Sequence, residues 1–106
     1  MWFLVTAIYL FYTPNQSLIC QVYGSVYEVN EPYLADLIIF EELSEVTADL
    51  LVYEQQNRLY ANKPGMWYFE DKKDFARFKI FFTTNKSEAD FIVYFTEFES
   101  FAGCSR

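Results

Sequence analysis

Carboxylates are the side chains through which this chain could do chemistry, since paired Asp and Glu serve as general acid, general base or nucleophile. Most of the conspicuous ones recur at matching places in the sequence: Glu28, Glu41 and Glu54, and then Asp36, Asp49 and Asp90. A catalytic carboxylate is needed once, in an unusual environment, whereas a residue copied from unit to unit serves the unit. We assign the aspartates to turns, with a calcium site and catalysis as alternatives, and the glutamates to an exposed edge that their charge protects from aggregation.

Two further glutamates, Glu97 and Glu99, stand outside these series and are the pair that a carboxylate-dependent hydrolase would use. They lie beside Phe98 and Phe101, which interrupt the polar pattern of the other turns. The two phenylalanines could anchor a protein partner or an inhibited target, or they could pack under the C-terminal tail.

Several classes of site are excluded by composition. The chain has no histidine, which removes Ser-His and Cys-His nucleophile pairs and every metal site that needs an imidazole. Its two cysteines are too few for a structural zinc site. Cys20 and Cys104 pair only if the two ends of the domain meet; otherwise Cys20 leaves with a cleaved leader and Cys104 keeps a free thiol. We therefore assign no catalytic, cofactor-binding or metal-binding residue.

The charge balance argues against nucleic acid as a partner. The chain has fifteen acidic and eight basic residues, for a net charge of −7. Binding to a phosphate backbone requires clustered Lys and Arg. The one basic cluster is Lys72, Lys73, Arg77 and Lys79, and it is interleaved with Asp71 and Asp74. We interpret it as a solvated face.

A repeat of about 13 residues determines the spacing of the structural units that position these side chains. Its alanines are Ala35, Ala48, Ala61, Ala76, Ala89 and Ala102, separated by 13, 13, 15, 13 and 13 residues. Eight residues before each alanine stands an aromatic ring: Tyr27, Phe40, Tyr53, Tyr68, Phe81 and Tyr94. The preceding residue is apolar in each unit: Val26, Ile39, Val52, Trp67, Ile80 and Val93. We expect the aromatic rings to form the core and the alanines to allow close packing of turns.

Short apolar runs such as 37–40, 50–53 and 91–95 predict strands, and their lack of alternation predicts that both faces are covered. The polar segments between them have room for a turn or a single helical turn, which Ser44 and Ser87 could cap. This spacing predicts a mainly β, single-domain sandwich or barrel-like body, rather than a parallel sheet with crossover helices. The insertion at 62–65 divides the six units into two halves.

The first twelve residues are uncharged and apolar, which is typical of a signal-peptide core and too short for a bilayer span. We expect residues 1–20 to be a leader, residues 21–106 to be the folded domain, and the product to be secreted or periplasmic. In the rival interpretation the run is an extra strand or helix, or a membrane-associated anchor, and the protein can then be cytoplasmic.

The pattern of strand, Tyr or Phe, polar turn and Ala-Asp resembles the septoil-knot family of small bacterial proteins of unknown function. The resemblance covers 21–106 and depends on the alanine phase, the Ala-Asp pairs at 35–36, 48–49 and 89–90, and segments 65–69 and 100–103. Asn62 and Arg77 depart from it by replacing the Asp. The resemblance implies a knotted backbone, a torus knot with seven crossings, and gives no catalytic residue. We expect a monomeric, exported structural or binding module without cofactors or catalytic activity; a partner-binding or inhibitor protein and a hydrolase are the alternatives.

Overall fold

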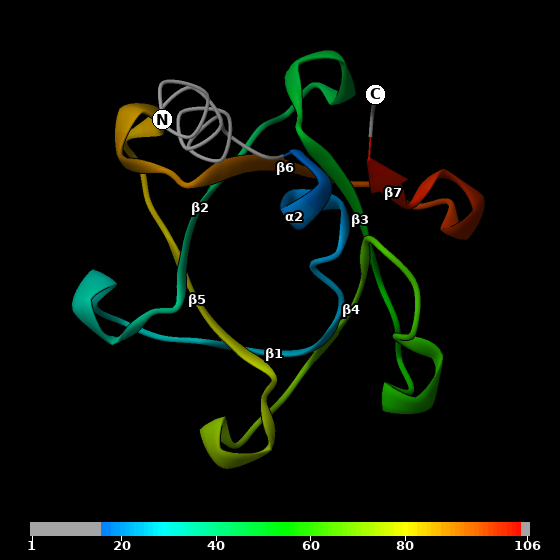
Figure 1. Ribbon diagram of the computed structural model, residues 1–106, viewed down its shortest axis with the longest axis horizontal. Helices are drawn as coiled ribbons and strands as arrows, with labels where there is room; N and C mark the ends of the chain where they lie inside the picture. Colours follow the sequence, from blue (N-terminus) through cyan, green and yellow to red (C-terminus); the bar gives the residue numbers. More distant parts are fainter. Residues whose placement is uncertain (1–15, 105–106) are drawn as a thin grey trace, which may run out of the picture.

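The computed structural model describes residues 16–104, which form a mainly β domain around a closed barrel of six parallel strands (Figure 1). The barrel strands are β1 (Gly24–Glu28), β2 (Leu37–Glu41), β3 (Leu50–Glu54), β4 (Met66–Phe69), β5 (Phe78–Phe82) and β6 (Phe91–Phe95). A two-residue strand, β7 (Gly103–Cys104), pairs antiparallel with β3. The short helix α2 (Gln16–Cys20) precedes the barrel.

Each barrel strand is followed by a connection that contains one 3₁₀ turn. These turns are η1 (Pro32–Leu34), η2 (Glu45–Thr47), η3 (Arg58–Tyr60), η4 (Lys73–Phe75), η5 (Lys86–Glu88) and η6 (Glu99–Phe101). The predicted barrel-like body with short helical turns is confirmed, and the described chain has no crossover helix. The parallel direction of the strands was not predicted, because parallel strands usually need a connection of about a dozen residues.

The order of the strands explains how such short connections suffice. Around the barrel the order is β4, β1, β5, β2, β6, β3, with β3 also paired to β4. The chain therefore passes from β1 to β2 across β5, and from β2 to β3 across β6, so that each of these two connections skips one strand. The longer third connection, which holds the insertion at 62–65, instead joins the neighbours β3 and β4. The first three strands in the sequence, β1 to β3, do not pair with one another, and the next three, β4 to β6, lie between them.

The core is built around the apolar residues that precede the aromatic rings, one from each unit, and Val22, Leu50 and Phe91 complete the buried cluster. All six are fully buried at 0% exposure: Val26, Ile39, Val52, Trp67, Ile80 and Val93. The aromatic rings that follow them, from Tyr27 to Tyr94, are only half-buried, because successive side chains of a strand point to opposite faces. The prediction that these rings form the core was therefore wrong, as was the prediction that both strand faces are covered.

A second repeated position lies two residues after each ring, directly after the strand, and it is buried in every unit except at Glu42, which is half-buried. Its backbone N–H donates to the carbonyl of a core residue on the neighbouring strand, as Gln55 does to Trp67 at 2.7 Å and Thr83 to Ile39 at 2.9 Å. The same bond occurs from Val29, Glu42, Glu70 and Thr96. These bonds extend each ladder by one step, so every unit fixes the same register.

The alanines end the 3₁₀ turns, where each donates its backbone N–H to the residue three positions earlier. Ala48 and Ala61 are buried and the other four are half-buried, which agrees with the predicted packing role. At the start of η2 the Ser44 hydroxyl accepts from the Val46 N–H at 3.3 Å, so this predicted cap is confirmed. Ser87 is not a cap, since Asn85 occupies that position in η5.

Candidate functional site

The phenylalanines of the last turn are the clearest candidate for a binding site. Phe98 and Phe101 are 59% and 53% exposed, and their ring centroids lie 5.3 Å apart with planes tilted by 55°. They form a solvent-facing aromatic pair on η6, so the alternative in which they pack under the tail is wrong for the described residues.

Phe98 stands where three other turns carry a polar capping residue. Ser44, Asn57 and Asn85 each accept a backbone N–H in the first turn of their 3₁₀ helices, whereas Phe98 makes no side-chain cap bond. Its own N–H donates to the Thr96 hydroxyl at 3.2 Å. The turns η1 and η4 also begin without a side-chain cap, at Glu31 and Lys72, so what distinguishes η6 is the exposed ring at this position and not the missing cap.

Other turns also expose large apolar side chains, which sequence reasoning missed. The most exposed are Leu43 at 91%, Val46 at 81%, Tyr33 at 80%, Leu59 at 76%, Tyr60 at 61% and Phe75 at 58%. Only η5, with Lys86, Ser87 and Glu88, is polar throughout among the described turns. Figure 1 shows η6 between η2 and η3, so the Phe98–Phe101 pair stands between two further turns with apolar tips.

The glutamates of the hydrolase hypothesis do not meet in a cleft. Glu99 borders a shallow, mostly apolar groove of about 640 Å³ together with Lys63, Pro64 and Met66, and Glu97 does not line it. Glu99 is the one carboxylate in that lining. Two cooperating carboxylates, which this chemistry requires, are therefore not brought together there.

The repeated aspartates have a structural role, but not the one predicted. The Asp49 N–H donates to the Ile92 carbonyl at 2.8 Å, and the Asp49 carboxylate accepts the Ile92 N–H at 2.9 Å. Asp36 holds Lys79, and Asp90 holds Ile38, in the same way. Each aspartate thus clasps a strand more than forty residues away rather than its own turn. In each aspartate the carboxylate oxygen Oδ2 is thus engaged by a backbone N–H of the neighbouring strand.

The remaining carboxylates are either exposed or paired. Glu28, Glu41 and Glu54 are exposed at the ends of the first three strands, as predicted. Glu42 accepts from the Lys86 ammonium at 2.9 Å and from the Thr47 hydroxyl at 3.1 Å, and these two bonds lower its pKa. In the described part of the chain, no group of three or more acidic or cysteine side chains is placed to hold a metal ion.

A second hollow, of about 390 Å³, mixes charges of both signs. Its lining includes Glu28 and Asp36 together with Lys73 and Lys79. Asp36 is already engaged by the Lys79 backbone, so the hollow offers no free pair of acids.

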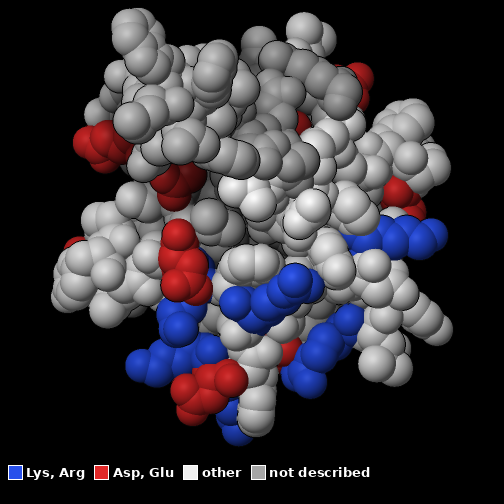
Figure 2. All heavy atoms as spheres, in the orientation of Figure 1, with Lys and Arg blue, Asp and Glu red and all other residues white. Residues whose placement is uncertain are grey.

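The basic cluster lies on a solvated face, as predicted. In Figure 2, most Lys and Arg atoms of the visible face gather toward the lower edge, where Asp and Glu atoms stand among them. Arg77 rests on the rings of Tyr23 and Phe78, at 4.7 and 5.3 Å from their centroids. Its guanidinium is therefore held against aromatic faces by cation–π contacts.

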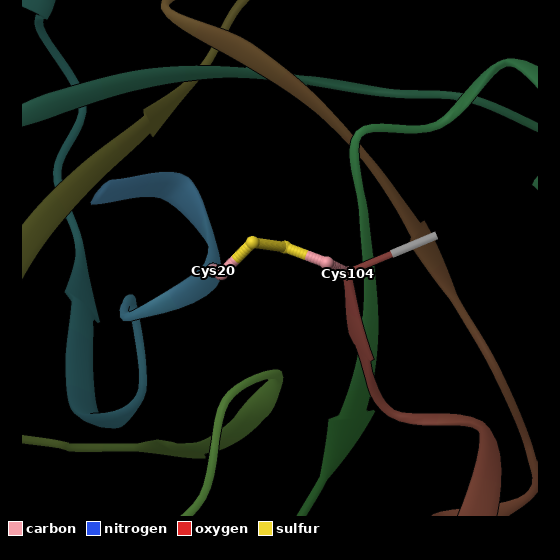
Figure 3. Close-up of a disulfide and its surroundings, with 2 residues drawn as sticks. All are labelled: Cys20 and Cys104. Atoms are coloured by element: carbon pink, nitrogen blue, oxygen red, sulfur yellow. A yellow bond between two sulfur atoms is a disulfide. The ribbon is translucent and has the colours of Figure 1, made fainter. Parts of the chain in front are cut away.

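The two cysteines form a disulfide, as expected if the two ends of the domain meet, while the removal of a leader stays a prediction. Cys20, at the end of α2, is bonded to Cys104 of β7, with their Cα atoms 5.2 Å apart (Figure 3). Beside it, the Trp67 indole N–H donates to the Val22 carbonyl at 3.1 Å and fixes the segment before β1 to β4. The two ends of the described chain therefore meet at one end of the barrel. Most of the expected leader, residues 1–15, lies outside the described residues.

Comparison with known proteins supports the architecture rather than any activity. Within residues 16–104, no helix has the length and apolar character that crossing a bilayer requires. Neither the curated proteins nor the solved structures contain a match to this chain. Residues 19–105 match a family described as the 7(1) septoil knot domain, and membership supports a knotted small domain. Because that match spans most of the sequence and agrees with the interleaved winding of the strands, this chain belongs to the septoil knot domain family.

Proposed function

We propose that this protein is an exported, monomeric binding module without catalytic activity, which holds a protein partner through Phe98 and Phe101. The observation that carries the proposal is the exposed aromatic pair that Phe98 and Phe101 form at η6. Aromatic side chains are over-represented among the residues that dominate binding energy, because they bury a large area at a small entropic cost.

The frame behind the pair is suited to presenting it. The Ala102 N–H closes η6 onto Glu99 at 3.2 Å, and the next residue, Gly103, is paired with Leu51 of β3. A turn fixed at its end loses little conformational freedom when it binds, so more of the contact energy remains for affinity.

A capture experiment tests this function. Wild-type protein and the variants Phe98→Ser and Phe101→Ser are immobilised and exposed to an extract of the native host, and bound proteins are identified by mass spectrometry. The matched control is Phe75→Ser on η4, because Phe75 is equally exposed at 58% but belongs to another turn. We expect a partner that wild type and Phe75→Ser retain and that both η6 variants lose. Equal retention by all four proteins would refute the role of the pair.

Export is part of the same proposal and rests on the disulfide. Stable disulfides form in oxidising compartments and are rare in the cytosol. A leader peptide must then be removed before Cys20, since cleavage after that residue would discard the bond to Cys104. Intact-mass measurement of the protein from its host, with and without reductant before alkylation, should show a shortened N-terminus and no free thiol. A full-length chain with two reactive thiols would contradict export.

A further inference from the structure

The disulfide occupies a particular place in the winding of the barrel. Around the barrel axis, the strands follow one another as β1, β5, β2, β6, β3 and β4. Leu50 and Leu51 of β3 pair with β6 on one edge and with β7 on the other, which is the edge that β4 takes at Tyr53, so β7 is counted between β3 and β4. Each step along the chain, from β1 to β2 and onward to β7, advances two places in this ring. The Cys20–Cys104 bond joins β7 to the segment before β1, and β1 again lies two places after β7 in the ring. Backbone and disulfide together form a closed loop that circles the axis twice.

Four of the seven crossings of this loop share one arrangement. The turn η1 packs on β5, η2 on β6, η4 on β1 and η6 on β3, and in each case this is the strand that the connection skips. Figure 1 shows the turns outside the ring of strands. Because the turn lies outside and the strand inside in all four, these crossings do not cancel one another. Together with the family match, which supports a knotted small domain, this arrangement indicates that the closed loop is a knotted ring rather than a simple one.

We propose that the Cys20–Cys104 disulfide is a redox-controlled lock on this winding. A linear chain can lose its winding when an unfolded end withdraws through the loops, and must be threaded again to refold. A closed ring cannot change its winding unless a covalent bond breaks. The oxidised protein therefore keeps its knot even when all non-covalent structure is lost, whereas the reduced protein can untie. Neither statement depends on a binding partner.

The chemistry of locking needs one oxidant, for which a small-molecule disulfide is sufficient. The thiolate of one cysteine attacks that disulfide and releases one small thiol, which leaves a mixed disulfide on the protein. The second cysteine thiolate then attacks the mixed disulfide, forms the Cys20–Cys104 bond and releases a second small thiol. Two protons and two electrons leave the protein, and the small disulfide is reduced. With two cysteines in the whole chain, no other intramolecular pairing can form.

The test compares two rings that have the same mass and the same bonds. The first ring is native oxidised protein that is unfolded in guanidinium without reductant. The second is protein that is reduced, unfolded in guanidinium for periods from minutes to days, and then oxidised in the denaturant with oxidised glutathione at low protein concentration. Both are returned to native buffer, and tertiary structure is followed by near-ultraviolet circular dichroism through Trp67, which is fully buried in the folded state.

We expect the first ring to refold completely and the second to refold in a fraction that falls as the unfolded period lengthens. The trapped fraction should recover when reductant is added, because the opened chain can thread again. The double variant Cys20→Ser with Cys104→Ser is the control, and its recovery should not depend on the oxidant. Slow proline isomerisation affects both rings equally and lasts minutes, so readings are taken after hours. Equal refolding of both rings at every period would overturn the proposal.

Discussion

At the scale of single residues, the tightest constraint falls on Gly65, which enters β4 beside the end of the chain. Its φ is +83°, and a Cβ built there would meet the Gly103 nitrogen and the Leu51 carbonyl oxygen well inside van der Waals contact. Both atoms belong to backbone and cannot rotate away. The insertion at 62–65 therefore does more than lengthen a turn, because it brings a residue without a side chain to the point where β3, β4 and β7 converge.

We predict that Gly65→Ala prevents stable folding or destabilises the protein far more than Gly24→Ala. Gly24 is the matched control, since its φ of +109° carries similar backbone strain while its added Cβ meets only the flexible Arg77 side chain, at 3.2 Å. Strain alone costs about 1–3 kcal/mol. Guanidinium unfolding of both variants measures the difference, and equal midpoints would show that the close approach at Gly65 is not required.

The clasp made by Asp49 predicts a second residue-scale effect. Asp49→Ala removes the acceptor of the Ile92 N–H, a hydrogen bond to a charged group that is worth about 1.5–3 kcal/mol, and Asp49→Asn should lose less because it keeps an oxygen. Glu54→Ala, at the exposed end of β3, serves as the control and should change the free energy of unfolding little. If Asp49→Ala and Glu54→Ala have the same midpoint in a urea titration, the hydrogen bond that Asp49 accepts from Ile92 does not stabilise the protein.

At the scale of elements, the sequence predicted where the strands lie but not which face of each strand is buried. The predicted runs 37–40, 50–53 and 91–95 fall within β2, β3 and β6, because short β-branched and aromatic runs between turn residues favour strands. The aromatic rings were misplaced because a half-buried outer face in this barrel is also apolar. The sequence therefore lacks the alternation of apolar and polar residues that usually identifies the buried face of a strand.

Neighbouring substitutions in β2 test which face is inward. Ile39 is fully buried in the core, at 0% exposure, whereas Phe40 is half-buried on the outer face. We expect Ile39→Ala to cost about 2–5 kcal/mol, and Phe40→Ala to cost less although it removes a larger side chain. Both are measured by chemical unfolding of the purified variants. A greater loss for Phe40→Ala would restore the prediction that the rings form the core.

The candidate site was predicted in part at this same scale. Phe98 and Phe101 stood out in the sequence because they interrupt a polar turn, and the structure exposes both. The apolar tips of the other turns did not stand out, because the sequence does not show that residues such as Leu59 and Val46 lie on turns outside the ring of strands. That placement is set by the barrel, not by the local sequence.

At the scale of the whole molecule, the interleaving of two sets of three strands could not be predicted from pattern or spacing. All six units offer similar edges, so local sequence does not say that β5 lies between β1 and β2. The resemblance to a knotted family supplied the winding, and the family match over 19–105 confirms the family. The number of crossings in this chain stays a prediction.

The most direct test of the interleaved barrel is a set of backbone nuclear Overhauser effects in isotopically labelled protein. The account predicts parallel-strand contacts between Ile38 and Phe81, and between Phe40 and Ile92, residues that are 43 and 52 positions apart in the sequence. Contacts that instead join consecutive strands directly, such as β1 with β2 or β2 with β3, would contradict it.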